Sequence, residues 1–319
     1  MKQALKWIHD AMSVKSFGMN FYCVDNGIIK ATNTNLTAGY PWLEGQQFLV
    51  PGMEFEKVLA RMPGEVSIAV NDGSIAIRSG RFRGTIQTLP MTDWNFPGVD
   101  AEWLPMPAGL PGILKALRPF ISDNTGQQWA MCIALQQGWC YATNNIALGG
   151  APCPELGDVQ AMLPVWAVDF IIDREEGLDA WAWTDHYVAF RWRNGAWMRS
   201  QLVVGEFPSK AAALVRSALN EQPTQKIGPE FRSAFLEIAD LAEDTILVYA
   251  DRIESTFGKA VITGEAECEV PQGAPASIWG AKYLAPIMDG ATHWSPGAWP
   301  KPAVFKGPVV SGYVVGRRA

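Results

Sequence analysis

The sequence predicts an α+β fold in which one small unit, a short helix with several strands, occurs six times. Three observations predict it: helical patterns recur along the chain, their starts repeat at a nearly constant step, and the segments between them alternate apolar and polar residues as strands do. Units of this kind build sheets that each carry helices on one face. We therefore expect an arc or a ring with the helices gathered along one wall.

The chain has the size and composition of about two or three soluble domains, with 319 residues of which 48% are hydrophobic and 18% charged. No apolar run reaches the roughly 18 residues of a membrane-spanning helix, and the N-terminus lacks the apolar stretch of a signal peptide. The five cysteines include no C-x-x-C pair, which argues against a disulfide framework or a structural zinc site. We expect a cytoplasmic protein with reduced thiols and no membrane partner.

Six helices are predicted, five of which start at a proline or a glycine. Proline is tolerated in the first helical turn because the backbone nitrogen there has no partner within the helix. The predicted helices span residues 1–14, 50–64, 109–123, 163–177, 226–242 and 277–290. Counted between alternate starting residues, the step is 113, 118 and 116 residues. This step predicts three domains, at residues 1–104, 105–223 and 224–319.

The segments between the predicted helices have the pattern of antiparallel hairpins. A turn at residues 71–73 brings the apolar residues of 66–70 beside Ile75 and Ile77. Residues 179–204 repeat the pattern, and both runs end in Phe-Pro. Each domain is therefore expected to hold two helix-plus-strands halves.

The residues that catalysis needs are scarce. The chain holds three histidines, none at the spacing of a helical zinc pair, and neither a phosphate-binding glycine loop nor a serine-hydrolase turn. Acids cluster at Glu265, Glu267 and Glu269, where alternation along a strand would place them on one face. A solvated strand face explains that pattern better, so we expect no cofactor, no metal and no catalytic residue. An enzyme that works through these acids and Asp185 is the least favoured alternative.

Four segments resemble the bacterial DNA polymerase III sliding clamps, the beta subunits of that polymerase. The first has an S-G-R turn at residues 79–81, T-L-P at 88–90 and Phe-Pro at 96–97. The others resemble the family's A-T-D-G-H-R-L-A loop, its G-x-F-P segment and its Y-V-V-M-P-M-R-L tail, and they lie at residues 138–149, 202–215 and 312–319. Because their order and spacing agree over essentially the whole chain, the sequence is identified as a divergent member, of a kind that a phage could encode.

The chain also departs from the family pattern. It starts directly on the first helix, so the leading strand of the first domain is expected to be missing and its sheet to lack an edge. Asn144 and Asn145 replace the Asp-Gly of the loop, and Gly316 stands where the tail has its first Met. These changes imply a retuned peptide pocket.

The resemblance implies a homodimer in which two three-domain chains close head to tail into a ring, with helices lining the hole and sheets forming the outer wall. Such a ring encircles duplex DNA and slides, because weak, sequence-independent contacts to phosphate do not hold it at any base pair. It would be a processivity factor that tethers the replicative DNA polymerase and is placed on DNA by a clamp loader.

The residues implied to face DNA are basic side chains on the predicted helices and two glutamines of a loop. The formal charges of residues 1–15, 53–64, 110–122, 163–177, 226–243 and 278–289 sum to −1, so ordinary solvated positions explain the basic residues equally well. Trp129, beside the glutamines, is expected in the core. The implied DNA-binding residues are Lys6, Lys15, Lys57, Arg61, Lys115, Arg118, Gln127, Gln128, Arg174, Lys226, Arg232 and Lys282.

The resemblance further implies a pocket between the second and third domains that accepts a short peptide from the polymerase and the loader. An apolar pocket with a few polar groups is the usual form of such a site. Ring closure would use contacts at Ile86 and Leu241, and plain core packing is the alternative for Leu148 and Val314. The pocket would be formed by Thr143, Asn145, Leu148, Pro208, Val314 and Gly316.

A second interpretation keeps the clamp fold and gives it another use. The chain has 14 tryptophans. Four of them lie on the predicted strands of the second domain and would bind another protein or a carbohydrate: Trp181, Trp183, Trp192 and Trp197. A monomer in solution would favour this interpretation, since a closed ring requires two chains.

Overall fold

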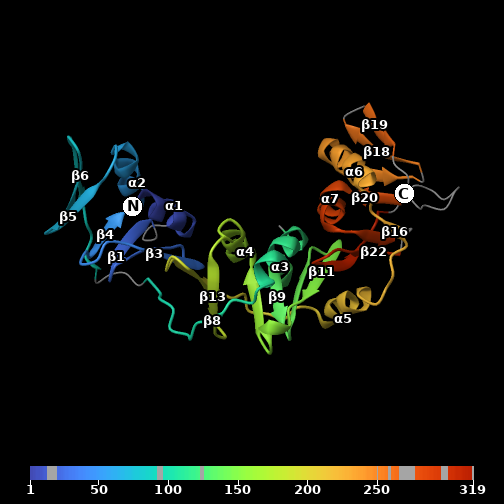
Figure 1. The fold of residues 1–319 in the computed structure, drawn as a ribbon, viewed down its shortest axis with the longest axis horizontal. Coiled ribbons are helices and arrows are strands. Elements are labelled where there is room, and N and C mark those ends of the chain that lie inside the picture. Colours follow the sequence, from blue (N-terminus) through green and yellow to red (C-terminus); the bar gives the residue numbers. More distant parts are fainter. Residues whose placement is uncertain are drawn as a thin grey trace. The chain divides into compact units, whose positions relative to one another are not determined.

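The computed structural model describes residues 1–12, 20–91, 96–122, 126–249, 251–257, 260–265, 277–295 and 301–317 (Figure 1). Three residues of the predictions, Lys15, Glu267 and Glu269, lie outside this part of the chain. The structure has two compact units, one comprising Met1–Met106 and Asp173–Leu202 and the other Pro107–Ile172 and Val203–Ala319. Both units combine helices with antiparallel sheets, which confirms the predicted α+β class.

The first unit contains an eight-stranded sheet in the order β4-β1-β2-β3-β15-β14-β13-β8. Two distant parts of the chain meet in it, because β3 (Leu36–Pro41) pairs antiparallel with β15 (Trp197–Gln201). Helices α1 (Lys2–Ile8) and α2 (Gly52–Arg61) pack against its strands. The remaining strands are β1 (Phe21–Asp25), β2 (Ile28–Thr32), β4 (Phe48–Pro51), β8 (Leu104–Pro105), β13 (Leu178–Trp183) and β14 (Tyr187–Trp192).

A three-stranded sheet, in the order β5-β6-β7, completes the first unit. Its strands are β5 (Ser67–Asn71), β6 (Ser74–Ser79) and β7 (Phe82–Gln87), as the hairpin pattern predicted. Ile75 and Ile77 are fully buried, and Gly84 of β7 faces α2. Both edges of this sheet, β5 and β7, carry no further strand among the described residues.

The second unit contains an eight-stranded sheet in the order β12-β9-β10-β11-β23-β22-β21-β16. Here β11 (Ala147–Pro152) pairs with β23 (Ser311–Val314), as β3 pairs with β15 in the first unit. Helices α3 (Leu110–Leu117) and α4 (Val165–Ile172) pack against each other and against this sheet. The remaining strands are β9 (Cys132–Gln136), β10 (Trp139–Thr143), β12 (Gln160–Pro164), β16 (Gln225–Lys226), β21 (His293–Ser295) and β22 (Ala303–Lys306).

The second unit also has a four-stranded sheet, in the order β19-β18-β17-β20. Helices α6 (Pro229–Leu241) and α7 (Ala281–Gly290) lie side by side next to it (Figure 1). Its strands are β17 (Thr245–Val248), β18 (Arg252–Phe257), β19 (Ala260–Glu265) and β20 (Ser277–Gly280).

One backbone hydrogen bond recurs three times at a constant step. The nitrogen of Leu89 donates to the oxygen of Leu49 over 2.9 Å, as Val203 does to Met162 over 3.2 Å. Arg317 does the same to Ile278 over 2.7 Å. The three donors lie 114 residues apart, within the step that the sequence predicts. The predicted domain bounds stay a prediction, because each eight-stranded sheet joins strands from two predicted domains.

The described residues form seven α-helices, so the expectation of six is wrong. The additional helix is α5 (Ser209–Ala218). Its sequence, SKAAALVRSA, is rich in alanine and begins after Pro208, and both features favour a helix. The apolar residues Ala212, Val215 and Ala218 are buried, whereas the lysine and the arginine of α5 are not. No helix in the described part of the chain is long and apolar enough to span a membrane.

Candidate nucleic-acid interface and partner site

The basic residues of the first unit gather on α1 and α2. Leu5 and Ile8 bury one side of α1, while Lys6 is exposed on the other. In α2, Lys57 and Arg61 are exposed and lie one turn apart, on one side of the helix. The two helices therefore present lysine and arginine to solvent, as an electrostatic DNA contact requires.

A pocket of about 750 Å³ lies between α1, α2 and the segment at Asp173–Arg174. Lys2, which the sequence reasoning missed, contributes to its rim and donates through Nζ to the oxygen of Met62 over 2.8 Å. Position 2 is one helical turn from Lys6, so the i,i+4 spacing could have identified it. The lining residues include Lys2, Lys6, Trp7, His9, Glu56 and Arg174.

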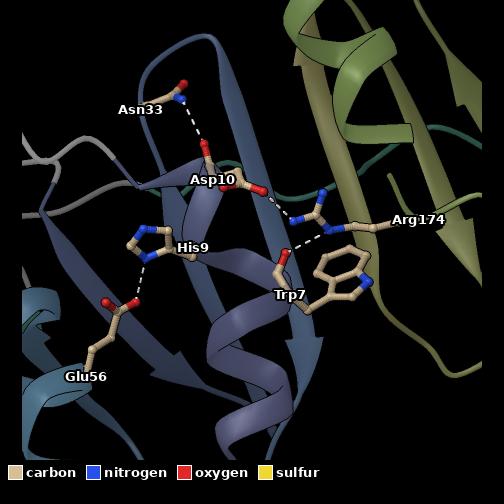
Figure 2. Close-up of polar contacts among 6 residues, drawn as sticks. All are labelled: Trp7, His9, Asp10, Asn33, Glu56 and Arg174. Atoms are coloured by element: carbon tan, nitrogen blue, oxygen red, sulfur yellow. Dashed lines mark hydrogen bonds and ion pairs between the residues drawn. The ribbon is translucent and has the colours of Figure 1, made fainter. Parts of the chain in front are cut away.

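Two pairs of oppositely charged or titratable side chains, Arg174 with Asp10 and His9 with Glu56, lie in this pocket. Figure 2 shows Arg174 between Trp7 and Asp10: its Nε donates to the oxygen of Trp7 over 3.1 Å and its Nη2 to Asp10 Oδ2 over 2.5 Å. The guanidinium also lies over the Trp7 ring, 5.7 Å from its centroid. Only 12% of the Arg174 side chain is exposed. The prediction that Arg174 contacts DNA is therefore corrected to a structural role.

On the other side of the pocket, His9 Nδ1 lies 2.7 Å from Glu56 Oε1 (Figure 2). Tyr22 donates its hydroxyl to the same carboxylate oxygen. Burial, together with Glu56, raises the pKa of Tyr22 well above its ordinary value, so this hydroxyl stays protonated. Glu56 thus ties α2 to α1 and to the sheet.

The second unit brings two of the predicted DNA contacts to one pocket of about 500 Å³. Lys282 of α7 is exposed there, with its Nζ 4.8 Å from the centroid of the Tyr283 ring. Arg118 lines the same pocket, but its Nε and Nη2 donate to both carboxylate oxygens of Asp169, the Nη2 over 3.1 Å. This bidentate pair holds the Arg118 guanidinium against the carboxylate of Asp169.

The other predicted DNA contacts are exposed, except one. Lys115, Lys226, Gln127 and Gln128 are open to solvent. Arg232 is half-buried, and its Nη2 donates to the oxygen of Ala291 over 2.5 Å, which ties α6 to the end of α7. The prediction for Arg232 is corrected in the same way as that for Arg174.

The residues predicted for a peptide pocket meet at β10, β11, β23 and α5. Thr143 lies opposite Leu148, and Leu148 lies opposite Tyr313. Because residues paired across a sheet share a face, these three side chains point to one side. The hydroxyl of Tyr313 bonds Ser217 Oγ of α5 over 3.1 Å, so that side is the one that α5 covers. The sequence reasoning missed Tyr313 because it missed α5.

Two of the predicted pocket residues, Val314 and Gly316, do not add side chains to this face. Val314 pairs with Ala147, so it points to the opposite face from Leu148, and it is 1% exposed. At Gly316, an added Cβ would lie 3.1 Å from the oxygen of Ile278. Position 316, where the family has a methionine, therefore has little room for a side chain in this protein. The core-packing alternative holds for Val314.

The remaining predicted residues support the turn and the start of α5. Thr143 Oγ1 donates to the oxygen of Ala147 over 2.9 Å and accepts from the nitrogen of Asn145 over 3.0 Å. Asn145 has φ of 71°, a left-handed conformation that asparagine tolerates, and its Nδ2 donates to Gln127 Oε1 over 2.7 Å. Pro208 caps α5, and Leu148 packs against a cluster that includes Phe207.

The tryptophan interpretation loses three of its four residues, whereas Glu267 and Glu269 of the enzyme alternative lie outside the described part of the chain. Trp181, Trp192 and Trp197 are at most 8% exposed, so they belong to the core and present no binding face. No group of three or more His, Cys, Asp or Glu could hold a metal in the part of the chain that the structure describes. Burial raises the pKa of Cys23 to about 11 and that of Cys132 to about 12, which keeps these thiols protonated.

No protein-family model matches the chain, and no curated protein sequence matches it. Solved structures do match it over its full length. The sliding clamp of C. crescentus has a TM-score of 0.81 at 15% identity, and a DNA polymerase sliding clamp of Pseudomonas aeruginosa has 0.79 at 14%. The beta clamp of Helicobacter pylori, solved with a DNA ligase peptide, has 0.78 at 14%. Each comparison covers 100% of this chain and 97% of the other.

Proposed function

Because the chain has the fold of the bacterial sliding clamps, as the sequence resemblance predicted, we propose that it is a DNA sliding clamp: a head-to-tail homodimer that encircles duplex DNA and tethers a polymerase. It acts in the cytoplasm and needs no catalysis and no cofactor. The observation that supports this proposal most strongly is a pair of unfinished sheets. Two sheets have eight strands, while a three-stranded and a four-stranded sheet end in the edge strands β7 and β19, which pair with no further strand among the residues that the structure describes.

The eight-stranded sheets predict how the open edges join. In each eight-stranded sheet, the second strand of a β-hairpin pairs with a strand from a later part of the chain. Strand β3 pairs with β15 in the first unit, and β11 pairs with β23 in the second. The hairpin β18–β19 has the same register as β2–β3 and β10–β11, since Thr32 opposes Thr37, Thr143 opposes Leu148 and Thr256 opposes Val261. Strand β19 therefore holds the place of β3 and β11, and its partner strand lies in a second copy of the chain.

Strand β7 corresponds to β15 and β23, the strands that pair with β3 and β11. The backbone nitrogen of Thr88 donates to the oxygen of Gly73, as Leu202 donates to His186 in the second repeat, which aligns Ile86 with Ser200. Since Leu36 pairs with Ser200, Ala260 is expected to pair with Ile86 of the second copy. In this register Val261 lies opposite Thr85, and Ile262 opposite Gly84. The Ile86 contact that the sequence predicted becomes a backbone pairing, because its side chain is 7% exposed.

Exposed apolar side chains mark the same two edges. Phe82 at the start of β7 is 55% exposed, Val261 of β19 is 65% exposed and Leu241 at the end of α6 is 48% exposed. Gly84 faces Val58 of α2, while Gly264 faces Ile238 of α6, so the joined sheet keeps both helices on one face. Pairing β7 with β19 would bury apolar surface that is costly to leave in water.

Contact with DNA is proposed for the exposed basic residues of the helices and their flanking segments. The ring holds DNA by enclosing it, so a few weak phosphate contacts suffice and the low net charge of the helices is no obstacle. Arg118, Arg174 and Arg232 are excluded from this set because their guanidinium groups are engaged within the chain. The proposed contacts are Lys6, Lys57, Arg61, Lys115, Gln127, Gln128, Lys226 and Lys282.

Replacing Lys57 and Arg61 together with glutamate tests this assignment. Both side chains are exposed on one side of α2, so the fold is expected to tolerate the change. We expect the affinity for circular duplex DNA at low salt to fall by about tenfold or more, with a flatter salt dependence, because two phosphate contacts are lost per chain. Arg193→Glu, at an exposed turn outside the helices, is the matched control. An equal loss in both variants would refute the role of α2.

Polymerase and clamp loader are proposed to bind at the surface formed by β11, the tail of the chain and α5. Ile146 and Val315 are 37% and 42% exposed and adjacent, since the nitrogen of Val315 donates to the oxygen of Ile146 over 2.9 Å. Leu214 of α5 is 52% exposed. This apolar surface, with Thr143, Asn145, Leu148, Pro208 and Gly316 beside it, suits a short apolar peptide, the kind of ligand that the clamp of Helicobacter pylori was solved with.

A further inference from the structure

The sheet β5-β6-β7 and the strands β13-β14-β15 of the same unit have corresponding outer faces, on the side away from the helices. Another segment of the chain covers the face of β13-β14-β15, whereas the face of β5-β6-β7 is exposed. The hydrogen bonds that align Thr88 with Leu202 also align Ile75 with Val188. Ala69, Ala76 and Arg78 then correspond to Ala182, Ala189 and Arg191. In both sheets the two alanines are paired across neighbouring strands.

An extended segment of the chain, residues 98–105, covers the second of these faces. Val99, Ala101 and Trp103 pack on Ala182, Tyr187 and Ala189, which are at most 3% exposed. The segment ends in β8, which adds to the sheet edge where Leu104 pairs with Trp181.

Three side chains of the sheet, Tyr187, Arg199 and Arg191, hold this segment. The hydroxyl of Tyr187 donates to Asp100 Oδ1 and accepts from the nitrogen of Ala101 over 3.0 Å. Arg199 Nη1 donates to the oxygen of Gly98 over 2.7 Å. Arg191 lies over the Trp103 ring, 5.1 Å from its centroid. The face thus recognises an acidic residue followed, three positions later, by an aromatic one.

The sheet β5-β6-β7 keeps the two alanines and the arginine of this face, while Ser74 and Thr85 stand in the places of Tyr187 and Arg199. Ala69 and Arg78 are exposed, and Ala76 is half-buried. Arg78 pairs with Arg83, and exposed Arg81 adds a third positive charge to this face. At the edge, Gln46 Nε2 donates to the oxygen of Ile68 over 3.0 Å. Ile68 corresponds to Trp181, which pairs with Leu104 of β8 in the covered sheet. The Gln46 side chain therefore hydrogen-bonds the residue of β5 at which an added strand would pair.

We propose that this face of β5-β6-β7 binds an extended acidic segment of a partner protein that also carries an aromatic residue. The aromatic ring stacks on Arg78, as Trp103 does on Arg191, and the acidic residue is attracted by the three arginines. The backbone of the segment adds to β5 in place of Gln46. The segment adds at β5, the edge opposite β7, so this edge stays available in a closed ring.

A labelled peptide with the sequence of residues 98–106, GVDAEWLPM, tests the proposal by fluorescence polarisation with the full-length protein. We expect saturable binding that Arg78→Glu weakens by about tenfold or more, since it removes the cation and repels the acid. Ala69→Tyr, which fills the exposed face and suits a strand, is expected to abolish binding without lowering stability. Arg193→Ala and a peptide lacking the aspartate and the tryptophan are the controls, the first leaving binding unchanged and the second showing none.

Two results would overturn the proposal. The first is no saturable binding by the natural sequence. The second is binding that Arg191→Ala abolishes and Arg78→Glu leaves intact, because the peptide would then be replacing residues 98–106 on their own sheet. Neither result depends on DNA or on ring closure, so the proposed clamp function would stand.

Discussion

Val261→Pro is expected to leave the protein folded but monomeric, and to abolish its retention on circular DNA. The backbone nitrogen of Gln201 donates to the oxygen of Asn35, next to β3. Because the backbone groups of a strand point to alternate sides, those of Thr37, two residues further, also point toward β15. Val261 holds the place of Thr37, and its nitrogen is therefore expected to point out of the chain. Proline removes that donor and is tolerated at an edge strand. Light scattering and gel filtration with a nicked plasmid measure both effects.

Val261→Thr is the matched control, because threonine keeps the backbone donor and suits a strand. It should remain a dimer and be retained on the plasmid. An unchanged urea unfolding curve for Val261→Pro separates lost pairing from lost folding. A proline variant that is still dimeric and still retained would show that β19 is not the ring interface.

Trp192→Ala is expected to lower the free energy of unfolding by about 3–5 kcal/mol, because it leaves a large cavity in the core of the first unit. Trp192 is 3% exposed and meets the ring of Trp7 edge-on, with 5.0 Å between ring centroids. Its Nε1 donates to the oxygen of Arg174, the residue that also holds Asp10. Urea denaturation followed by circular dichroism measures the loss.

Trp183→Ala serves as the comparison, since Trp183 sits on the same sheet and is only half-buried. We expect a clearly smaller loss of stability for it, with Trp192→Phe in between. A Trp192 variant that keeps its stability and instead loses a protein or carbohydrate ligand would restore the alternative in which the tryptophans form a binding face.

Local features of the fold could be predicted from the sequence. Proline and glycine punctuation located five helices, and the turn at residues 71–73 located the hairpin of β5 and β6, because both signals depend on neighbouring residues only. The pairing of β3 with β15 could not be predicted in this way. It joins residues about 160 positions apart, and no local pattern encodes which edge strands meet.

The candidate site was predicted less well than the fold. Residue type alone identified Arg118 and Arg174 as cations for DNA, but Asp169 and Asp10 lie close enough in space to pair with them. The face of Val314 depends on the register of β11 with β23, which a one-residue shift would reverse. Tyr313 was missed because its contact is with Ser217 of α5, a helix that was not predicted.

The most direct test of ring closure is covalent. A variant with Thr85→Cys and Val261→Cys, in a Cys268→Ser background, places one new thiol on each expected edge strand, while Cys23, Cys132, Cys140 and Cys153 are buried. A short bismaleimide should join two chains at both interfaces, and the closed ring should stay on a nicked circular plasmid through detergent until the plasmid is linearised. Loss from the circular plasmid in detergent, or equal retention on linear DNA, would contradict the claim that this protein encircles DNA.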